Sequence, residues 1–154
     1  MSSQLFIPEK LPLEIQQKQL KALFEAWLNH VQLDLLGGIL VQFVSTEDML
    51  ELVRVHQQKD ESTDVLSFNY NPPLVGESGD KIIGEIVICE DVARDNADKH
   101  KVEFGVECMT LFVHGLLHIA GKDHAGRREK EQFEADTRAI MEVGGLKPVS
   151  LWSD

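Results

Sequence analysis

Three histidines in one short segment are the residues of this chain best suited to do chemistry. They are His114, His118 and His124, spaced four and then six residues apart, with Gly121 between the last two. Residues four apart lie on the same face of a helix, so the first two imidazoles can reach one metal ion. Gly121 is the residue type that most readily takes the left-handed conformation that ends a helix, which lets the chain bring His124 back as a third ligand.

This ligand set predicts a catalytic zinc site with one ion per chain. Three histidines leave a fourth position of Zn²⁺ open for water, whereas structural zinc is usually closed by four protein ligands. No cysteine lies near the segment. Such a set of three nitrogens also accepts nickel, cobalt or copper, and zinc is the expected occupant.

The histidine spacing is that of the zinc peptidases that contain H-E-x-x-H-x-x-G-x-x-H, with one decisive difference. Gly115 occupies the position of their general base. Because glycine cannot take a proton from water, the ligand pattern is kept without the peptidase chemistry, and Gly115 is expected to leave space beside the metal. A peptidase or another zinc hydrolase would need a base elsewhere, for example Glu107 or Asp123.

The segment from His114 to His124 resembles the motif H-G-x-L-H-L-x-G-Y-D-H of the YbeY family, bacterial zinc-dependent endoribonucleases also called rRNA maturation factors. Two upstream segments fit as well. Residues 62–68, S-T-D-V-L-S-F, are similar to that family's P-T-D-V-L-S-F-P, and residues 83–88, I-G-E-I-V-I, are similar to its L-G-D-I-V-I. The resemblance covers roughly residues 41–143.

The resemblance implies that His114, His118 and His124 bind zinc. It also implies an endoribonuclease that matures ribosomal RNA, chiefly of the small subunit, and serves ribosome quality control, with that RNA and the small ribosomal subunit as partners. The family usually has an arginine where this chain has Gln57. Arg54 lies one helical turn earlier and is the candidate to supply the missing charge. Replacing Arg54 with alanine is then expected to impair RNA cleavage but not zinc content.

Other residues near the motifs have two interpretations each. Asp123 either orients a ligand imidazole or caps the helix that follows. Thr63, Asp64 and Ser67 either line the cleft or form a turn before a buried strand. The remaining histidines, His30, His56 and His100, have no spacing that ties them to the metal and are interpreted as ordinary. Gln57 also keeps open an alternative function, a ribosome-assembly factor in which zinc only stabilises the fold.

Composition sets the frame for these motifs. The chain has 154 residues, with 43% hydrophobic and 27% charged residues, which predicts one globular domain over residues 1–154. The N-terminus has no basic segment followed by an apolar one, and the longest apolar run is too short to span a bilayer, so the protein is expected to be neither exported nor embedded in a membrane. Cys89 and Cys108 form no C-x-x-C pair, which indicates buried thiols in a reducing cytoplasm.

The net charge of -11 opposes RNA binding, because affinity for RNA depends largely on lysine and arginine. Basic residues nevertheless gather on both sides of the histidine segment, where they form either an RNA-facing patch or solvated helix faces. They are Arg94, Lys99, His100, Lys101, Lys122, Arg127, Arg128 and Lys130.

The periodicity of apolar residues predicts an α+β fold, with a small mixed sheet of about four strands flanked by about five helices. The zinc site is expected on a helix and the turn after it. Helices are predicted over residues 13–31, 45–55, 90–99, 102–120 and 127–143, and strands over residues 39–44, 65–68 and 82–89. Residues 71–80 are rich in turn-forming residues and are expected to form a flap over the site.

Overall fold

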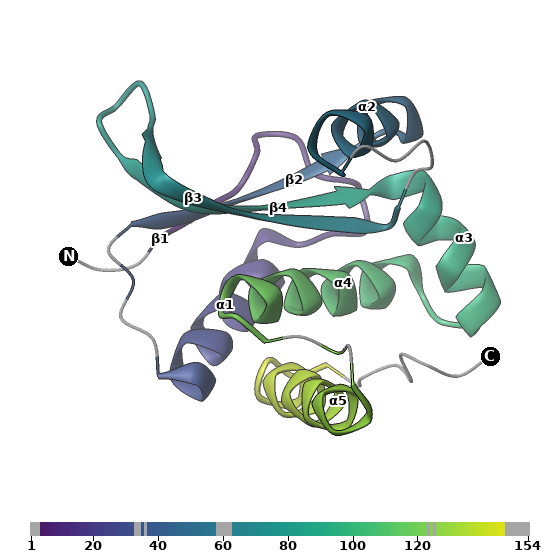
Figure 1. The fold of residues 1–154 in the computed structure, drawn as a ribbon. Coiled ribbons are helices and arrows are strands. Elements are labelled where there is room, and N and C mark those ends of the chain that lie inside the picture. Colours follow the sequence, from purple (N-terminus) through teal and green to yellow (C-terminus); the bar gives the residue numbers. More distant parts are fainter. Residues whose placement is uncertain are drawn as a thin grey trace.

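The computed structural model describes residues 4–32, 35, 37–57, 63–122, 124 and 126–146. The described residues form one four-stranded sheet with helices on both faces (Figure 1). The strands are β1 (Gln4–Phe6), β2 (Gly38–Val44), β3 (Val65–Val75) and β4 (Lys81–Cys89), in the order β1-β2-β4-β3. Only β3 runs antiparallel to its neighbour. The predicted α+β class with a mixed sheet is therefore confirmed.

Five helices pack around this sheet in the described part of the chain. They are α1 (Gln17–Val31), α2 (Thr46–Gln57), α3 (Glu90–His100), α4 (Phe104–Ile119) and α5 (Arg127–Val143). Helix α4 runs along one face of the sheet, with α1 and α5 packed beyond it, while α2 covers the opposite face (Figure 1). Helix α3 leads from the end of β4 to the start of α4, so these two helices meet at one end of the sheet.

The alternation of side chains along β4 divides the interior into two apolar layers. Ile86 and Ile88 are fully buried in the larger cluster, together with the buried side of α4. Val87 points to the other face, where it joins Met49 and Val53 of α2 in a smaller cluster. Neighbouring residues of a strand point to opposite faces, so the nearly continuous apolar run of β4 reflects burial on both sides.

The predicted helices are confirmed, with shifts at most of their ends. Helix α5 begins and ends at the predicted residues, whereas α1 begins later than expected. The reason for the late start is a turn before α1, in which the Ile15 N–H donates to the Pro12 carbonyl at 2.9 Å and leaves Leu13 fully exposed. The short strand β1 was not predicted, because three residues are too few to show a period of two.

Strand β3 is longer than predicted and continues through Pro72 and Pro73. Proline lacks the N–H that a central strand requires, but β3 is an edge strand and its pairing with β4 is irregular between Asn69 and Leu74. Residues 71–75 therefore belong to a hairpin arm, and the tip of the hairpin projects away from α4 (Figure 1). Among the described residues, no member of 71–80 lines the cavity at α4, so the expected flap over the site is not seen.

The described helices do not include a single one that is long and apolar enough to cross a membrane. One bent pair, α3 with α4, has the length and composition to do so at an angle of 113°, but most of the α4 side chains are buried against the sheet and its neighbours. Cys89 and Cys108 are buried and unpaired, as predicted.

Candidate metal and RNA-cleavage site

Helix α4 and the turn after it position the three histidines. His114 and His118 lie one helical turn apart on α4, as the spacing predicts. The helix then ends in a Schellman motif: the N–H of Gly121 donates to the His118 carbonyl at 3.0 Å, and the N–H of Lys122 donates to the Leu117 carbonyl at 2.9 Å. Gly121 has φ +86°, the left-handed value that favours glycine. This reversal returns the chain toward α4, which brings His124 beside His118.

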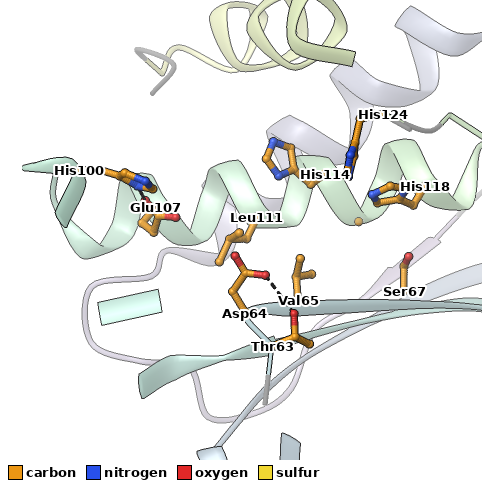
Figure 2. A pocket seen from close by; sticks show the side chains of 11 residues that line it. Thr63, Asp64, Val65, Ser67, His100, Glu107, Leu111, His114, His118 and His124 are labelled. Atoms are coloured by element: carbon orange, nitrogen blue, oxygen red, sulfur yellow. Dashed lines mark hydrogen bonds and ion pairs between the residues drawn. The ribbon is translucent and has the colours of Figure 1, made fainter. Parts of the chain in front are cut away.

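Phe133 of α5 forms the wall against which all three imidazoles pack. Its ring centroid lies 5.1 Å from that of His114, 5.0 Å from that of His118 and 5.1 Å from that of His124. The rings of His118 and His124 are 5.2 Å apart. Figure 2 shows the three side chains gathered at one end of the cavity. Three residues from two different segments of the chain are thus held together by one fully buried aromatic side chain.

The surroundings of His114 favour its neutral, metal-binding form. Burial, together with His118 and His124, lowers the pKa of His114 to about 3, so this ring is uncharged at neutral pH. The Nδ1–H of His118 donates to the Lys122 carbonyl at 3.1 Å, which turns Nε2 toward the cavity. Metal-binding histidines commonly donate their second N–H to a carbonyl in this way. Among the described residues, however, no three His, Cys, Asp or Glu side chains already stand in positions to hold an ion.

The same cavity continues away from the histidines toward the start of β3 and the junction of α3 with α4. It has a volume of about 350 Å³. The far end is lined by Asp64, His100 and Glu107, with Leu111 between Glu107 and His114 on α4 (Figure 2). The His100 Nδ1 lies 2.7 Å from a carboxylate oxygen of Glu107, whose side chain is 4% exposed. The cavity therefore has one imidazole end and one acidic end.

Desolvation dominates the electrostatics of the acidic end. Burial raises the pKa of Asp64 above its ordinary value, against hydrogen bonds from the backbone and from Thr63. Burial also raises the pKa of Glu107, helped by the nearby Asp64 charge and opposed by His100. The Asp64 carboxylate accepts long hydrogen bonds from the Thr63 hydroxyl at 3.5 Å and from the Asn96 amide at 3.3 Å.

Gly115 lines the same cavity as the three histidines, and the structure gives a further reason for a glycine at this position. A Cβ at this position would lie 2.7 Å from Cγ2 of Ile86, which is fully buried on β4. The absent side chain instead lets α4 lie close against the sheet. A glutamate at this position, as in the peptidases, would collide with Ile86.

The sequence matches a known family over the elements that build this cavity. Residues 8–144 match the family described as Endoribonuclease YbeY. The chain belongs to this family. It is 33% identical over 109 residues to Endoribonuclease YbeY of Staphylococcus saprophyticus, an alignment that covers 69% of this chain and 71% of that protein. It is 30% identical over 134 residues to the Staphylococcus aureus protein of the same name, covering 84% and 86%.

A solved structure has a similar fold over nearly the whole chain. The solution structure of TM1509 from Thermotoga maritima matches with a TM-score of 0.56 and 26% sequence identity, covering 92% of this chain and 90% of that one. Membership of the YbeY family confirms the predicted family and the predicted enzyme class, an endoribonuclease, which hydrolyses RNA. The family is one of metalloenzymes.

The structure does not bring every predicted YbeY site residue to the cavity. Arg54 is exposed on α2, which lies across the sheet from α4, and it is not among the residues that line the cavity. Gln57 ends α2, and its side chain lies outside what the structure describes. Asp123 also lies outside the described residues. The proposed roles of Arg54 and Asp123 stay predictions.

The sequence does not place two residues of the acidic end, His100 and Glu107, in the cavity. His100 was interpreted as an ordinary histidine, and Glu107 was considered only as an alternative base. The signal for Glu107 was its place on α4, two turns before His114, where an acidic side chain is buried among apolar ones. No local pattern marks His100, because it reaches the cavity from α3 through its bond to Glu107.

Several of the basic residues near the motifs are engaged by other side chains. The Arg94 guanidinium pairs with Glu14 at 2.8 Å and lies 3.9 Å above the centroid of the Phe104 ring. Arg127 pairs with Glu131 at 3.6 Å on the exposed side of α5. Arg94 therefore links the segment before α1 to helices α3 and α4. For Arg94 this favours the interpretation as part of a solvated helix face over that of an RNA-facing patch.

Proposed function

We propose that this protein is a zinc-dependent endoribonuclease that matures ribosomal RNA, chiefly that of the small subunit, and takes part in ribosome quality control. The observation that carries the proposal is the group of three imidazoles in one cavity, with His114 kept neutral and His118 held by a backbone carbonyl. Family membership supports the RNA chemistry. The small ribosomal subunit is the proposed partner.

His114, His118 and His124 would hold the ion, one per chain. The donor set fits zinc because all three groups are imidazoles, no thiolate is nearby, and three ligands leave room for water or substrate. When bound, zinc lowers the pKa of water and polarises phosphoryl oxygens. Nickel, cobalt and copper are the other ions that such a site accepts.

The protein's own residues prepare this cavity for a phosphodiester. The burial that keeps His114 uncharged also excludes water from one side of the site. Phe133 limits the motion of all three rings, and the turn at Gly121 fixes His118 through the Lys122 carbonyl. Preorganised groups of this kind lower the cost of assembling the reacting geometry. The buried, unpaired Cys89 and Cys108 support the proposed cytoplasmic location.

Metal content and cleavage of ribosomal RNA, measured together, test the proposal. Wild-type protein is expected to carry about one zinc per chain and to cut the RNA, with cutting abolished by a chelator. His118→Ala should lose both properties. His56→Ala is the matched control, because His56 packs against Phe68 on the α2 side of the sheet and should keep both. RNA left intact by a zinc-loaded wild-type protein would contradict the proposal.

A second candidate function is a ribosome-assembly factor in which zinc only stabilises the fold. The observation that favours it is Gln57 in place of the family arginine, with Arg54 outside the cavity lining. In that case His118→Ala would still associate with ribosomes as a folded protein, and metal removal would lower the melting temperature without changing a catalytic rate. The peptidase alternative is weaker, because the position of its base cannot hold a glutamate beside Ile86.

A further inference from the structure

Glu107, at the acidic end of the cavity, lies too far from His114 to act on a phosphate held by the histidines. Glu107 and His114 are seven residues apart on α4, which is about 10 Å along a helix axis. A group that transfers a proton in the reaction must lie within about 3 Å of it, or one water away. The distance instead suits a nucleoside, whose base extends from its phosphate by several ångströms. The two ends of the cavity are thus placed to hold two parts of one nucleotide.

Charge sets the direction in which a nucleotide enters. Asp64 and Glu107 repel a phosphate, while the imidazole end, with its metal, attracts it. Between the two ends, Leu111 and Val65 provide apolar walls, the kind of surface on which an unstacked RNA base packs. The cavity volume of about 350 Å³ is within the range of small-molecule sites.

The polar atoms of the acidic end accept hydrogen bonds. One oxygen of Glu107 pairs with His100, and among the described residues the other has no hydrogen-bond partner. The Asp64 carboxylate points from the start of β3 toward α4 (Figure 2), and its contacts with Thr63 and Asn96 are long. An ionised carboxylate can accept about four hydrogen bonds, so both groups keep acceptor capacity.

We propose that Asp64 and Glu107 form a guanine-binding subsite beside the metal site, which selects the nucleotide next to the cut. Guanine is the RNA base with two adjacent N–H donors, N1–H and the N2 amine, on its Watson–Crick edge. Adenine, cytosine and uracil each present one donor group there. Two neighbouring carboxylates therefore discriminate in favour of guanine, and His100 holds Glu107 in place. The inference rests on the proposed function for the position of the phosphate.

Burial provides independent support for a ligand that donates hydrogen bonds. Burial raises the pKa of each carboxyl group, which means that the protein around them solvates both charges poorly. N–H groups of a bound base would replace the missing water contacts. A phosphate or a carboxylate ligand would make the desolvation worse.

The test uses short single-stranded RNAs in which one nucleotide differs. Each oligonucleotide is uridine throughout except for a single guanosine, adenosine, cytidine or inosine, and the cut position is read on a sequencing gel. Zinc-loaded wild type is expected to cut next to guanosine about 10-fold faster than next to inosine, which lacks the N2 amine, as for the loss of one good base contact. Equal rates for guanosine and inosine would overturn the proposal.

Two variants connect the preference with the proposed residues. Glu107→Gln and Asp64→Asn keep side-chain size but remove an acceptor, so each should lose most of the preference for guanosine over inosine while retaining bound zinc. Glu103→Gln is the matched control, because it removes one charge at the exposed N-terminus of α4. Preference retained in both subsite variants, verified as folded by thermal melting, would refute the assignment.

A binding measurement separates failure of the subsite from failure of the proposed function. Isothermal titration of the zinc-loaded protein with GMP, IMP, AMP, CMP and UMP needs no cleavage. Tighter binding of GMP than of IMP, lost in Glu107→Gln, would support the subsite even if wild type cut no RNA. Equal binding of the five nucleotides would overturn the subsite while leaving the endoribonuclease proposal to its own test.

Discussion

At the scale of single residues, the site depends on a side chain that is absent. Gly115 distinguishes this cavity from the active sites of peptidases with the same histidine spacing, which have a glutamate as general base at this position. The structure gives a second reason for the glycine, besides the absence of that base. The space where a side chain would begin is filled by Ile86, so the glycine sets the distance between α4 and β4. Because His114 and His118 lie on α4, that distance also sets their position over the sheet.

Gly115→Ala tests this packing role. The added Cβ would lie 2.7 Å from Cγ2 of Ile86, which is fully buried. Overpacking costs about 1–3 kcal/mol, which outweighs the gain of up to about 1 kcal/mol from alanine in a helix. Urea unfolding should show a lower free energy of unfolding. Gly76→Ala is the control, since its nearest atom is the Asp80 carbonyl oxygen at 3.7 Å. A variant as stable as wild type would contradict the packing role.

The stability of the apo protein should depend on pH through Asp64. Burial raises the pKa of Asp64 in the folded state above that of a free aspartate, so the folded state binds this proton more tightly than the unfolded state. The resulting stabilisation is complete below pH 4 and is lost as pH rises through the folded pKa. The stability of Asp64→Asn relative to wild type should therefore increase between pH 4 and pH 7.

Urea unfolding of both proteins at the two pH values measures this difference. Asp98 is exposed on α3 and does not line the cavity that Asp64 lines, so Asp98→Asn serves as the control and should show no such gain. A difference between Asp64→Asn and wild type that is the same at pH 4 and pH 7 would argue against a buried, destabilised carboxylate.

At the scale of elements, the sequence predicts those helices and strands whose apolar residues recur with a regular period. It does not predict strands that form only because a neighbouring strand pairs with them. The five helices follow from apolar periodicity, and the histidine site follows from the spacing within α4 and its terminal glycine. The strand β1 and the second half of β3 exist because neighbouring strands pair with them, which no local pattern records. For the same reason the sequence does not predict that Asp64, His100 and Glu107 line one cavity, because they come from three different parts of the chain.

Helix α5 is expected to control metal affinity through Phe133. Phe133→Leu removes the ring that packs on all three imidazoles, which loosens them. We expect zinc affinity to fall on the order of tenfold, measured by competition with a chromogenic chelator. Stability should fall by about 1–2 kcal/mol from the lost core volume.

Phe24→Leu is the control for that experiment. Phe24 is similarly buried on α1, where it packs with Trp27 and not with the histidines. It should therefore show a comparable loss of stability with unchanged zinc affinity. Equal zinc affinity in Phe133→Leu and wild type would show that the histidines hold their positions without the aromatic wall.

At the scale of the whole molecule, an acidic protein must act on an acidic polymer. The net charge of -11 repels RNA at long range, so binding needs a local concentration of positive charge near the cavity. Lys122 lies in the turn between His118 and His124, and Arg127 and Arg128 begin α5 directly after it. All three side chains are exposed. We expect this group to meet phosphates beside the site. The ion pair of Arg127 with Glu131 is highly exposed and therefore weak, whereas Arg94 both pairs with Glu14 and packs on Phe104.

Salt dependence tests this arrangement. For single-stranded RNA the logarithm of the binding constant falls with the logarithm of salt concentration by about 0.7 per neutralised phosphate. Replacing Lys122, Arg127 and Arg128 together with glutamine should therefore reduce the slope by roughly 2 and weaken binding of all RNA sequences alike. The control replaces exposed Lys18, Lys21 and Lys81 with glutamine, which changes the net charge equally but far from the histidine segment in sequence. If both triple variants change the slope equally, the RNA responds to total charge and no basic patch beside the cavity directs it.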